Sequence, residues 1–80
     1  MITERVGDGS WADIPGTHLR VYAELEPTGW AFSVFDLNRK VWVVQGQSAD
    51  DEADARNTAE RWVFQAGLLM PGTSLQWQRQ

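Results

Sequence analysis

The chain has 80 residues, a formal net charge of −4 and no cysteine. This length allows one hydrophobic core but no separate catalytic lobe, and the lack of cysteine excludes disulfides, thiolate nucleophiles and cysteine-bound metals. The seven basic residues are scattered, whereas binding to nucleic-acid phosphates needs clustered Lys and Arg. No apolar run approaches the ~20 residues of a membrane span, and the first residues lack a secretion-signal pattern. We therefore expect a cytoplasmic protein with no membrane contact and no direct nucleic-acid contact.

The beginning of the chain predicts an irregular arm followed by a strand. Residues 1–16 mix glycine, aspartate and proline with isolated apolar residues, which is typical of irregular structure. The one strand-like stretch in this arm is Ile2 to Val6, which would form a short edge strand. From His18 onward apolar and polar residues alternate strictly up to Glu26, and this period of two predicts a half-buried strand.

Two further strands are predicted after short turns. Pro27, Thr28 and Gly29 have turn chemistry, so the strand at 30–37 would form a hairpin with the first. A second turn leads to a third strand at 40–45. The side chains expected on one sheet face are Leu19, Trp30, Phe32, Val34, Val41 and Val43, and those expected on the other are Tyr22, Phe35, Trp42 and Val44.

A single amphipathic helix is predicted between Ser48 as N-cap and Gln65. Its apolar residues recur at helical spacing, and Glu52 and Arg56 have the order of a favourable i,i+4 ion pair. Gly67 is suited to end the helix, and a fourth, edge strand follows at 73–78. The predicted fold class is therefore α+β, as one domain: a three-stranded antiparallel meander, a helix packed on one sheet face and a C-terminal strand (β-β-β-α-β).

The residues give no basis for catalysis, a cofactor or a metal site. His18 is the only histidine, so neither a His-based metal cage nor a nucleophile–His–Asp unit could be completed. The acidic residues at the helix start are consecutive on a helix and point in different directions, so they cannot converge on one cation. No glycine-rich phosphate loop is present. We therefore expect no enzyme activity.

The aromatic content predicts a binding surface. Five Trp residues are more than so small a core can enclose, and exposed aromatic patches mark partner surfaces. If the helix covers one sheet face, Tyr22, Phe35 and Trp42 would form such a patch on the other. The alternative is that the N-terminal arm folds back and covers this face with Trp11 and Ile14.

The order of elements resembles that of the HicB antitoxin family. The resemblance covers residues 19–66 and rests on the run from Tyr22 to Glu26, on Gly29-Trp30, on Phe35-Asp36-Leu37 and on the Gly46 to Ala53 segment that enters the helix. The proline before Asp36, the Gly-Cys after it and the DNA-binding tail of that family are missing. The resemblance implies a non-catalytic domain that inhibits a partner protein by covering it, and it implies a homodimer as one form.

The sequence thus predicts a protein-interaction module, an antitoxin-like inhibitor of a partner protein. A second interpretation is a phage or mobile-element inhibitor similar to an anti-CRISPR protein, in which acidic residues mimic phosphates towards a nucleic-acid-binding protein. A small enzyme or a nucleic-acid binder is a distant third. The predicted partner-binding residues are Tyr22, Phe35, Trp42, Asp50, Asp51, Glu52 and Asp54.

Overall fold

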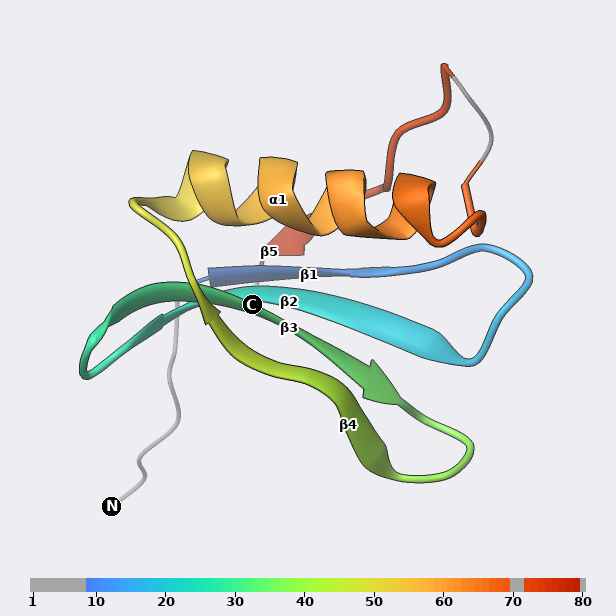
Figure 1. Cartoon of the computed structure of the whole chain (residues 1–80), viewed down its shortest axis with the longest axis horizontal. Coiled ribbons are helices and arrows are strands. Elements are labelled where there is room, and N and C mark those ends of the chain that lie inside the picture. Colours follow the sequence, from blue (N-terminus) through green and yellow to red (C-terminus); the bar gives the residue numbers. More distant parts are fainter. Residues whose placement is uncertain (1–8, 70–71, 80) are drawn as a thin grey trace.

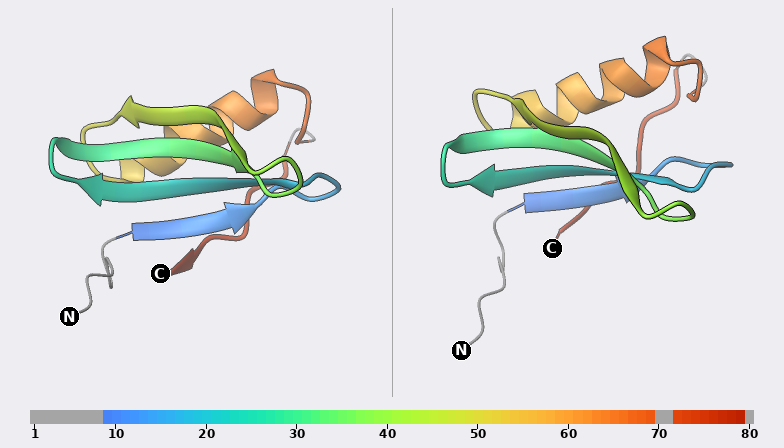
Figure 2. Two further views of the ribbon diagram at one scale, coloured as in Figure 1. Left: turned by 90° about the horizontal axis from the view of Figure 1, so that it is seen from below. Right: turned by 60° about the horizontal axis from the view of Figure 1, so that its bottom comes forward.

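The computed structural model, which describes residues 9–69 and 72–79, is an antiparallel sheet of five strands with one helix across one face (Figure 1). The elements are β1 (Gly9–Asp13), β2 (Leu19–Glu26), β3 (Gly29–Asp36), β4 (Val41–Ser48), α1 (Glu52–Gln65) and β5 (Gln78–Arg79). The strand order is β4-β3-β2-β1-β5. Figure 2 shows that α1 lies on one side of the sheet and that, within the described ranges 9–69 and 72–79, no helix lies on the other side. The predicted α+β class is confirmed, but four strands precede the helix instead of three.

The central hairpin of the sheet is the predicted one. β2 and β3 pair without interruption from Leu19 opposite Asp36 to Glu26 opposite Gly29. Gly29 has a φ of 121°, which glycine adopts without the steric penalty of a side chain. Within the hairpin Val21 lies opposite Val34, and both side chains are fully buried beneath the helix.

The prediction of an irregular arm over residues 1–16 is wrong for β1, which is a regular strand between β2 and β5. Small residues hide this strand from a hydropathy pattern, because Ser10 and Ala12 are its buried positions. Trp11 alternates with them and points to the opposite face. Ile14 enters the core on the helix side, so it does not cover the open face. The predicted strand at Ile2 to Val6 lies outside the described residues.

The side chains of β4 do not all point to the sheet faces that the sequence predicts. Its pairing with β3 shifts twice, once between Phe32 and Val34 and once between Val34 and Phe35. Each shift adds one extra residue to β4 relative to β3, and an inserted residue reverses the alternation that follows it. As a result Val44 packs against the core, not beside Trp42 as predicted. Val41 and Val43 were expected to face the helix, but 46% and 48% of their surface is exposed.

The helix begins three residues later than predicted. Ser48 still belongs to β4, where it lies opposite Ala31, and the N-cap is Asp51, whose carboxylate accepts a hydrogen bond from the Asp54 amide at 2.8 Å. The predicted end at Gln65 is confirmed. Gly67 follows with a φ of 77°, the left-handed conformation that commonly terminates helices.

The core lies between α1 and the strands β2 and β3. Ala55, Ala59 and Val63 form the buried stripe of the helix, and the two alanines let the helix backbone approach the sheet closely. The predicted edge strand at 73–78 is wrong for 73–77, which form no strand although Leu75 is buried; the edge strand β5 begins only at Gln78. Among the described residues no helix is long and apolar enough to cross a membrane. The buried core residues are Ala12, Ile14, Val21, Ala23, Phe32, Val34, Ala55, Ala59, Val63 and Leu75.

Candidate functional site

The sheet face away from the helix carries one aromatic side chain from each of four neighbouring strands. Pairing places Trp11 of β1 opposite Tyr22 of β2, and Phe35 of β3 opposite Trp42 of β4. Arg20 of β2 lies opposite Phe35 and shares this face. We call this group the aromatic patch; its members are Trp11, Arg20, Tyr22, Phe35 and Trp42.

The rings of the aromatic patch contact one another across strands. The Trp42 ring lies 4.8 Å from the Phe35 ring, at an interplanar angle of 66°, and 5.9 Å from the Tyr22 ring. Edge-to-face arrangements of this kind are favoured by the aromatic quadrupole. Ser33 lies opposite Tyr22 on the intervening strand, and its small side chain leaves room for the Tyr22 and Trp42 rings to approach over it. The patch therefore has a fixed shape before any partner arrives.

Arg20 supplies the positive charge of the patch. Its guanidinium carbon lies 4.2 Å from the centre of the Trp11 ring, and its Nε donates to Asp13 Oδ1 at 2.7 Å. The hydrogen bond to Asp13 raises the pKa of Arg20, and it outweighs the opposing effect of burial. The guanidinium is thus held over an indole by a cation–π contact and by its ion pair with Asp13.

The prediction about exposed aromatic residues is supported by the position of the indoles. Trp42 is 44% exposed, and none of the five Trp residues, all of which are described, falls in the buried class. Tyr22, Phe35 and Trp42 were predicted as partner-binding residues, and the structure brings them together. The pattern did not identify Trp11 and Arg20, because β1 was not recognised and an alternating Arg looks like an ordinary surface residue.

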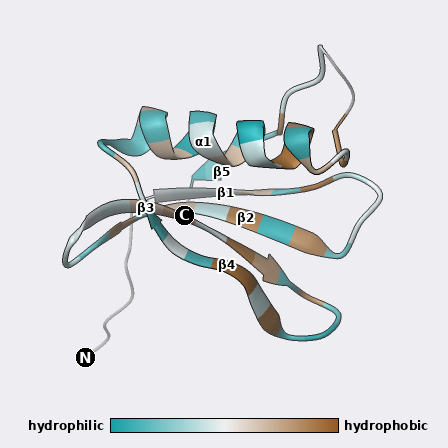
Figure 3. Ribbon diagram, in the orientation of Figure 1, coloured by the Kyte–Doolittle hydropathy of each residue, from teal (hydrophilic) through white to brown (hydrophobic). Residues whose placement is uncertain are grey.

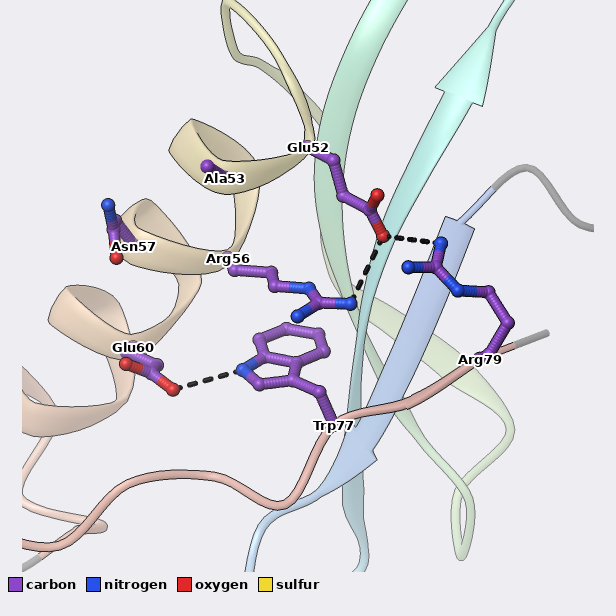
Figure 4. Close-up of a pocket in the computed structure, with 7 residues that line it drawn as sticks. All are labelled: Glu52, Ala53, Arg56, Asn57, Glu60, Trp77 and Arg79. Atoms are coloured by element: carbon purple, nitrogen blue, oxygen red, sulfur yellow. Dashed lines mark hydrogen bonds and ion pairs between the residues drawn. The ribbon is translucent and has the colours of Figure 1, made fainter.

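The acidic residues at the start of α1 do not form one surface. Asp51 caps the helix, and Asp54 Oδ2 accepts the backbone amide of Asp50 at 2.9 Å. Glu52 instead points towards β1 and β5 (Figure 4). Three of the four acids predicted to bind a partner are therefore engaged, Asp51 and Asp54 in local hydrogen bonds at the helix start and Glu52 in an internal contact, whereas Asp50 contributes only its backbone amide.

Glu52 is the centre of a polar cluster that ties the helix to the sheet edge. Its Oε2 accepts hydrogen bonds from the Ser10 hydroxyl at 2.9 Å, from Arg56 at 3.2 Å and from Arg79 at 2.9 Å. Burial raises the pKa of Glu52, but the hydrogen bonds from Ser10 and Arg79 and the nearby guanidinium charges outweigh it, so the pKa lies below its ordinary value of 4.5. The i,i+4 pair with Arg56 was predicted and is confirmed.

The same cluster continues along a groove between α1 and the C-terminal segment. Figure 4 shows the Arg56 guanidinium over the Trp77 ring, at 5.4 Å from its centre. The Trp77 indole N–H donates to Glu60 Oε2 at 2.9 Å. The groove encloses about 380 Å³. All of its charged side chains and the Trp77 indole contact one another, so the groove has the character of a structural contact. Its lining residues are Glu52, Ala53, Arg56, Asn57, Glu60, Trp77 and Arg79.

Metal-ligating residues are dispersed over the described part of the chain, where no three His, Cys, Asp or Glu side chains are grouped to hold an ion. His18 is exposed in the turn before β2. Neither a protein-family model, nor a curated protein, nor a solved structure matches the chain. The aromatic patch is thus the strongest candidate site, and its geometry alone supports a functional proposal.

Proposed function

We propose that this chain is a non-enzymatic protein-interaction module that binds a partner protein with the aromatic patch and inhibits the partner by covering its surface. The observation that carries this proposal is the one-sided sheet: α1 covers one face, and the other presents four aromatic side chains and an arginine. Trp, Tyr and Arg are the residues that contribute most to binding energy at protein interfaces.

The rigidity of the aromatic patch supports the same proposal. Its residues stand on four strands that are hydrogen-bonded to their neighbours, and ring contacts restrict Trp42 further. Side chains that are already ordered lose little conformational entropy when they bind. A partner of matching chemistry has an apolar surface that receives the Trp42 ring, with polar groups around it that reach Arg20.

This proposal has two biological forms, an antitoxin that covers a toxin and a phage or mobile-element inhibitor that covers a host protein. The HicB-like segment at 19–66 corresponds to β2, β3, β4 and α1, so three of the patch strands lie within it. In the acidic phosphate-mimic form, binding would use Asp50, Asp51, Glu52 and Asp54 instead. The aromatic patch is favoured over these acids because Glu52 is bound by two arginines and Asp51 and Asp54 are engaged in capping.

The test is a binding measurement on a partner captured with the wild-type chain from extracts of its native host. Once the partner is purified, Trp42→Ala should weaken its binding by about 2 kcal/mol, or roughly 30-fold in Kd, because Trp42 is the most exposed ring of the patch. Phe64→Ala is the matched control, since Phe64 is an aromatic residue on the outer face of α1 with 50% of its surface exposed. It should leave the Kd unchanged.

Three outcomes would contradict the proposal. Unchanged binding by Trp42→Ala with a lowered melting temperature would make Trp42 a structural residue. Equal losses for Trp42→Ala and Phe64→Ala would remove the patch as the specific surface. Binding that falls steeply with salt and ignores Trp42→Ala would assign the interaction to the acidic residues instead.

A further inference from the structure

The aromatic patch offers hydrogen-bond donors to a partner. Trp11 and Trp42 each carry an indole N–H, and among the described residues only the Trp77 indole donates a hydrogen bond within the chain. No buried side-chain nitrogen or oxygen in this part of the chain lacks a partner, so the N–H of the half-buried Trp11 is accessible to solvent. Tyr22 adds a phenol O–H. Arg20 adds its Nη1 group, because its ion pair uses only Nε and Nη2.

The hydrogen-bond acceptors beside these donors are already engaged. Both Asp13 oxygens accept from Arg20, at 2.7 Å and 3.2 Å. Ser33 Oγ accepts a backbone amide of β4 at 2.9 Å, and Glu24, the next side chain on this face of β2, has a partner of its own. The patch therefore suits a ligand that brings apolar surface and acceptors but few donors.

We propose that the partner presents a proline-rich segment in the polyproline II conformation to the aromatic patch. Proline has no backbone N–H, and the carbonyl groups of a polyproline II helix form no internal hydrogen bonds. Such a segment therefore brings free acceptors to the donors of the patch, and its rings pack on aromatic side chains. The inference rests on the proposed function, because it names the chemistry of the partner that the patch would bind.

Other backbone conformations match the patch less well. An α-helix uses its carbonyl groups internally, so it would cover the indole N–H groups of Trp11 and Trp42 without giving them an acceptor. A strand or loop of ordinary composition brings one N–H for each C=O, and these N–H groups would meet further donors. A polyproline II segment is also ordered before it binds, as the patch is, so little conformational entropy is lost on either side.

The dimensions of the patch fit a short segment. Its residues lie on the four neighbouring strands β1 to β4, which gives a width of about 14 Å at the usual ~4.8 Å between strands. A polyproline II helix rises about 3.1 Å per residue, so roughly five residues cross the patch. Figure 3 shows that the half of β4 that contains Trp42 is apolar, and β4 contains no charged residue. The segment can therefore continue past Trp42 to the sheet edge without meeting a charged side chain of β4.

The test is an NMR titration of the isotope-labelled chain with a decaproline peptide that is blocked at both ends. We expect saturable binding with a Kd below ~1 mM and shifts of the Trp11 and Trp42 indole N–H signals. The indole signals of Trp62 and Trp77, which pack on the helix side of the sheet, should stay in place. A blocked glycine–serine peptide of the same length is the control ligand. It is flexible and carries N–H donors, so it should bind at least roughly tenfold more weakly.

Two substitutions separate the contribution of the rings from that of the donors. Trp42→Ala should raise the Kd for decaproline more than about tenfold, because it removes the most exposed ring of the patch. Tyr22→Phe keeps the ring and removes only the O–H, and it should raise the Kd about threefold. Phe64→Ala, on the outer face of α1, is the matched control and should leave the Kd unchanged.

Four results would each overturn the inference: no saturable binding below ~1 mM, indole shifts confined to Trp62 and Trp77, equal affinity for the glycine–serine peptide, or an unchanged Kd in Trp42→Ala or Tyr22→Phe. If decaproline does not bind but the captured partner still depends on Trp42, this inference is wrong and the proposed function stands. If decaproline binds as expected but Trp42→Ala leaves partner binding unchanged, the proposed function is wrong and the patch keeps its affinity for polyproline.

Discussion

Removing the charge of Glu52 should destabilise the fold, because this carboxylate joins α1 to both β1 and β5. Glu52→Gln keeps a hydrogen-bond acceptor for Ser10 but loses the ion pairs with Arg56 and Arg79. Arg79 is 57% exposed and Glu52 24%, so solvent weakens their attraction. We expect a loss of about 1–2 kcal/mol in the free energy of unfolding, which combines weakened charged hydrogen bonds with the lost helix-dipole interaction.

Truncation should cost more than removal of the charge. Ser10 is completely buried, and in Glu52→Ala its hydroxyl loses its carboxylate acceptor. Arg56 Nε still donates to the Ser10 oxygen at 3.0 Å, so only the O–H is left without an acceptor. A buried donor without an acceptor costs roughly 1–3 kcal/mol, so Glu52→Ala should be less stable than Glu52→Gln by about 1 kcal/mol. The comparison separates the charge from the hydrogen bond.

The assay is urea unfolding followed by tryptophan fluorescence at several pH values. For a chain of this size the urea dependence is about 1 kcal/mol per M, so Glu52→Gln should move the midpoint down by roughly 1–2 M at pH 7. Asp50→Asn is the control, because within the described part of the chain Asp50 forms a hydrogen bond only through its backbone amide, which donates to the Asp54 carboxylate. It should stay within about 0.5 kcal/mol of wild type.

The pH dependence follows from the lowered pKa of Glu52. A carboxyl with a lower pKa in the folded state stabilises the fold fully at pH values above its unfolded pKa, near 4.5, and loses this contribution as the pH falls through the folded pKa. The difference between wild type and Glu52→Gln should therefore be constant from pH 7 to about 5 and shrink below pH 4.5. Equal midpoints at pH 7, or a difference that persists at pH 2, would refute the role given to this carboxylate.

Two further predictions concern the core and the bulged strand. Val63→Ala should lower the free energy of unfolding by about 2 kcal/mol in the same urea assay. Val63 is fully buried between α1 and the sheet, and its truncation leaves a cavity. A change below about 0.5 kcal/mol would mean that the helix is not packed there. Gly46→Ala should cost about 1 kcal/mol because Gly46 has a φ of 67°, although a Cβ would meet only Glu26 Oε1 at 3.8 Å. Gly46→Asn should cost less, since asparagine tolerates this conformation, and equal stability of Gly46→Ala and wild type would contradict the strain argument.

The elements that the sequence predicts correctly are those with strong local periodicity. The β2–β3 hairpin follows from unbroken alternation and from a turn that contains Pro27 and Gly29. The helix stripe of Ala55, Ala59 and Val63 follows from i,i+4 spacing. In both cases the signal lies within about ten residues of chain, so no tertiary information is needed to recognise it.

The missed features depend on contacts between distant residues. β1 is stabilised as a strand by β2 on one side and β5 on the other, and its small buried residues give no hydropathy signal. The shifts in β4 invert the facing of Val44 relative to Trp42, and the only local sign of them is Gly46 with its positive φ. At the helix start Ser48, Asp50 and Asp51 all suit an N-cap, and the extension of β4 through Ser48 excludes the serine.

The candidate site was likewise predictable only where local alternation places its residues. The alternation of β2 and β3 places Tyr22 and Phe35 on one face, and Trp42 joins them. Trp11 could be added only once β1 was in the sheet, whereas the alternation of β2 already places Arg20 on the face of Tyr22. Glu52 was predicted to face a partner and instead faces Arg56 and Arg79, because β5 brings an arginine 27 positions away to the start of the helix.

The position of α1 over β2 and β3 makes the two halves of the sheet unequal in rigidity. β2 has a strand on each side and the helix above it, whereas β4 has a strand on one side only and buries none of its residues fully. Local opening of β4 therefore requires less free energy than global unfolding, and its amide protons exchange with solvent while the rest of the sheet stays closed. The same edge position leaves the backbone of β4 freer than that of β2 to change its twist.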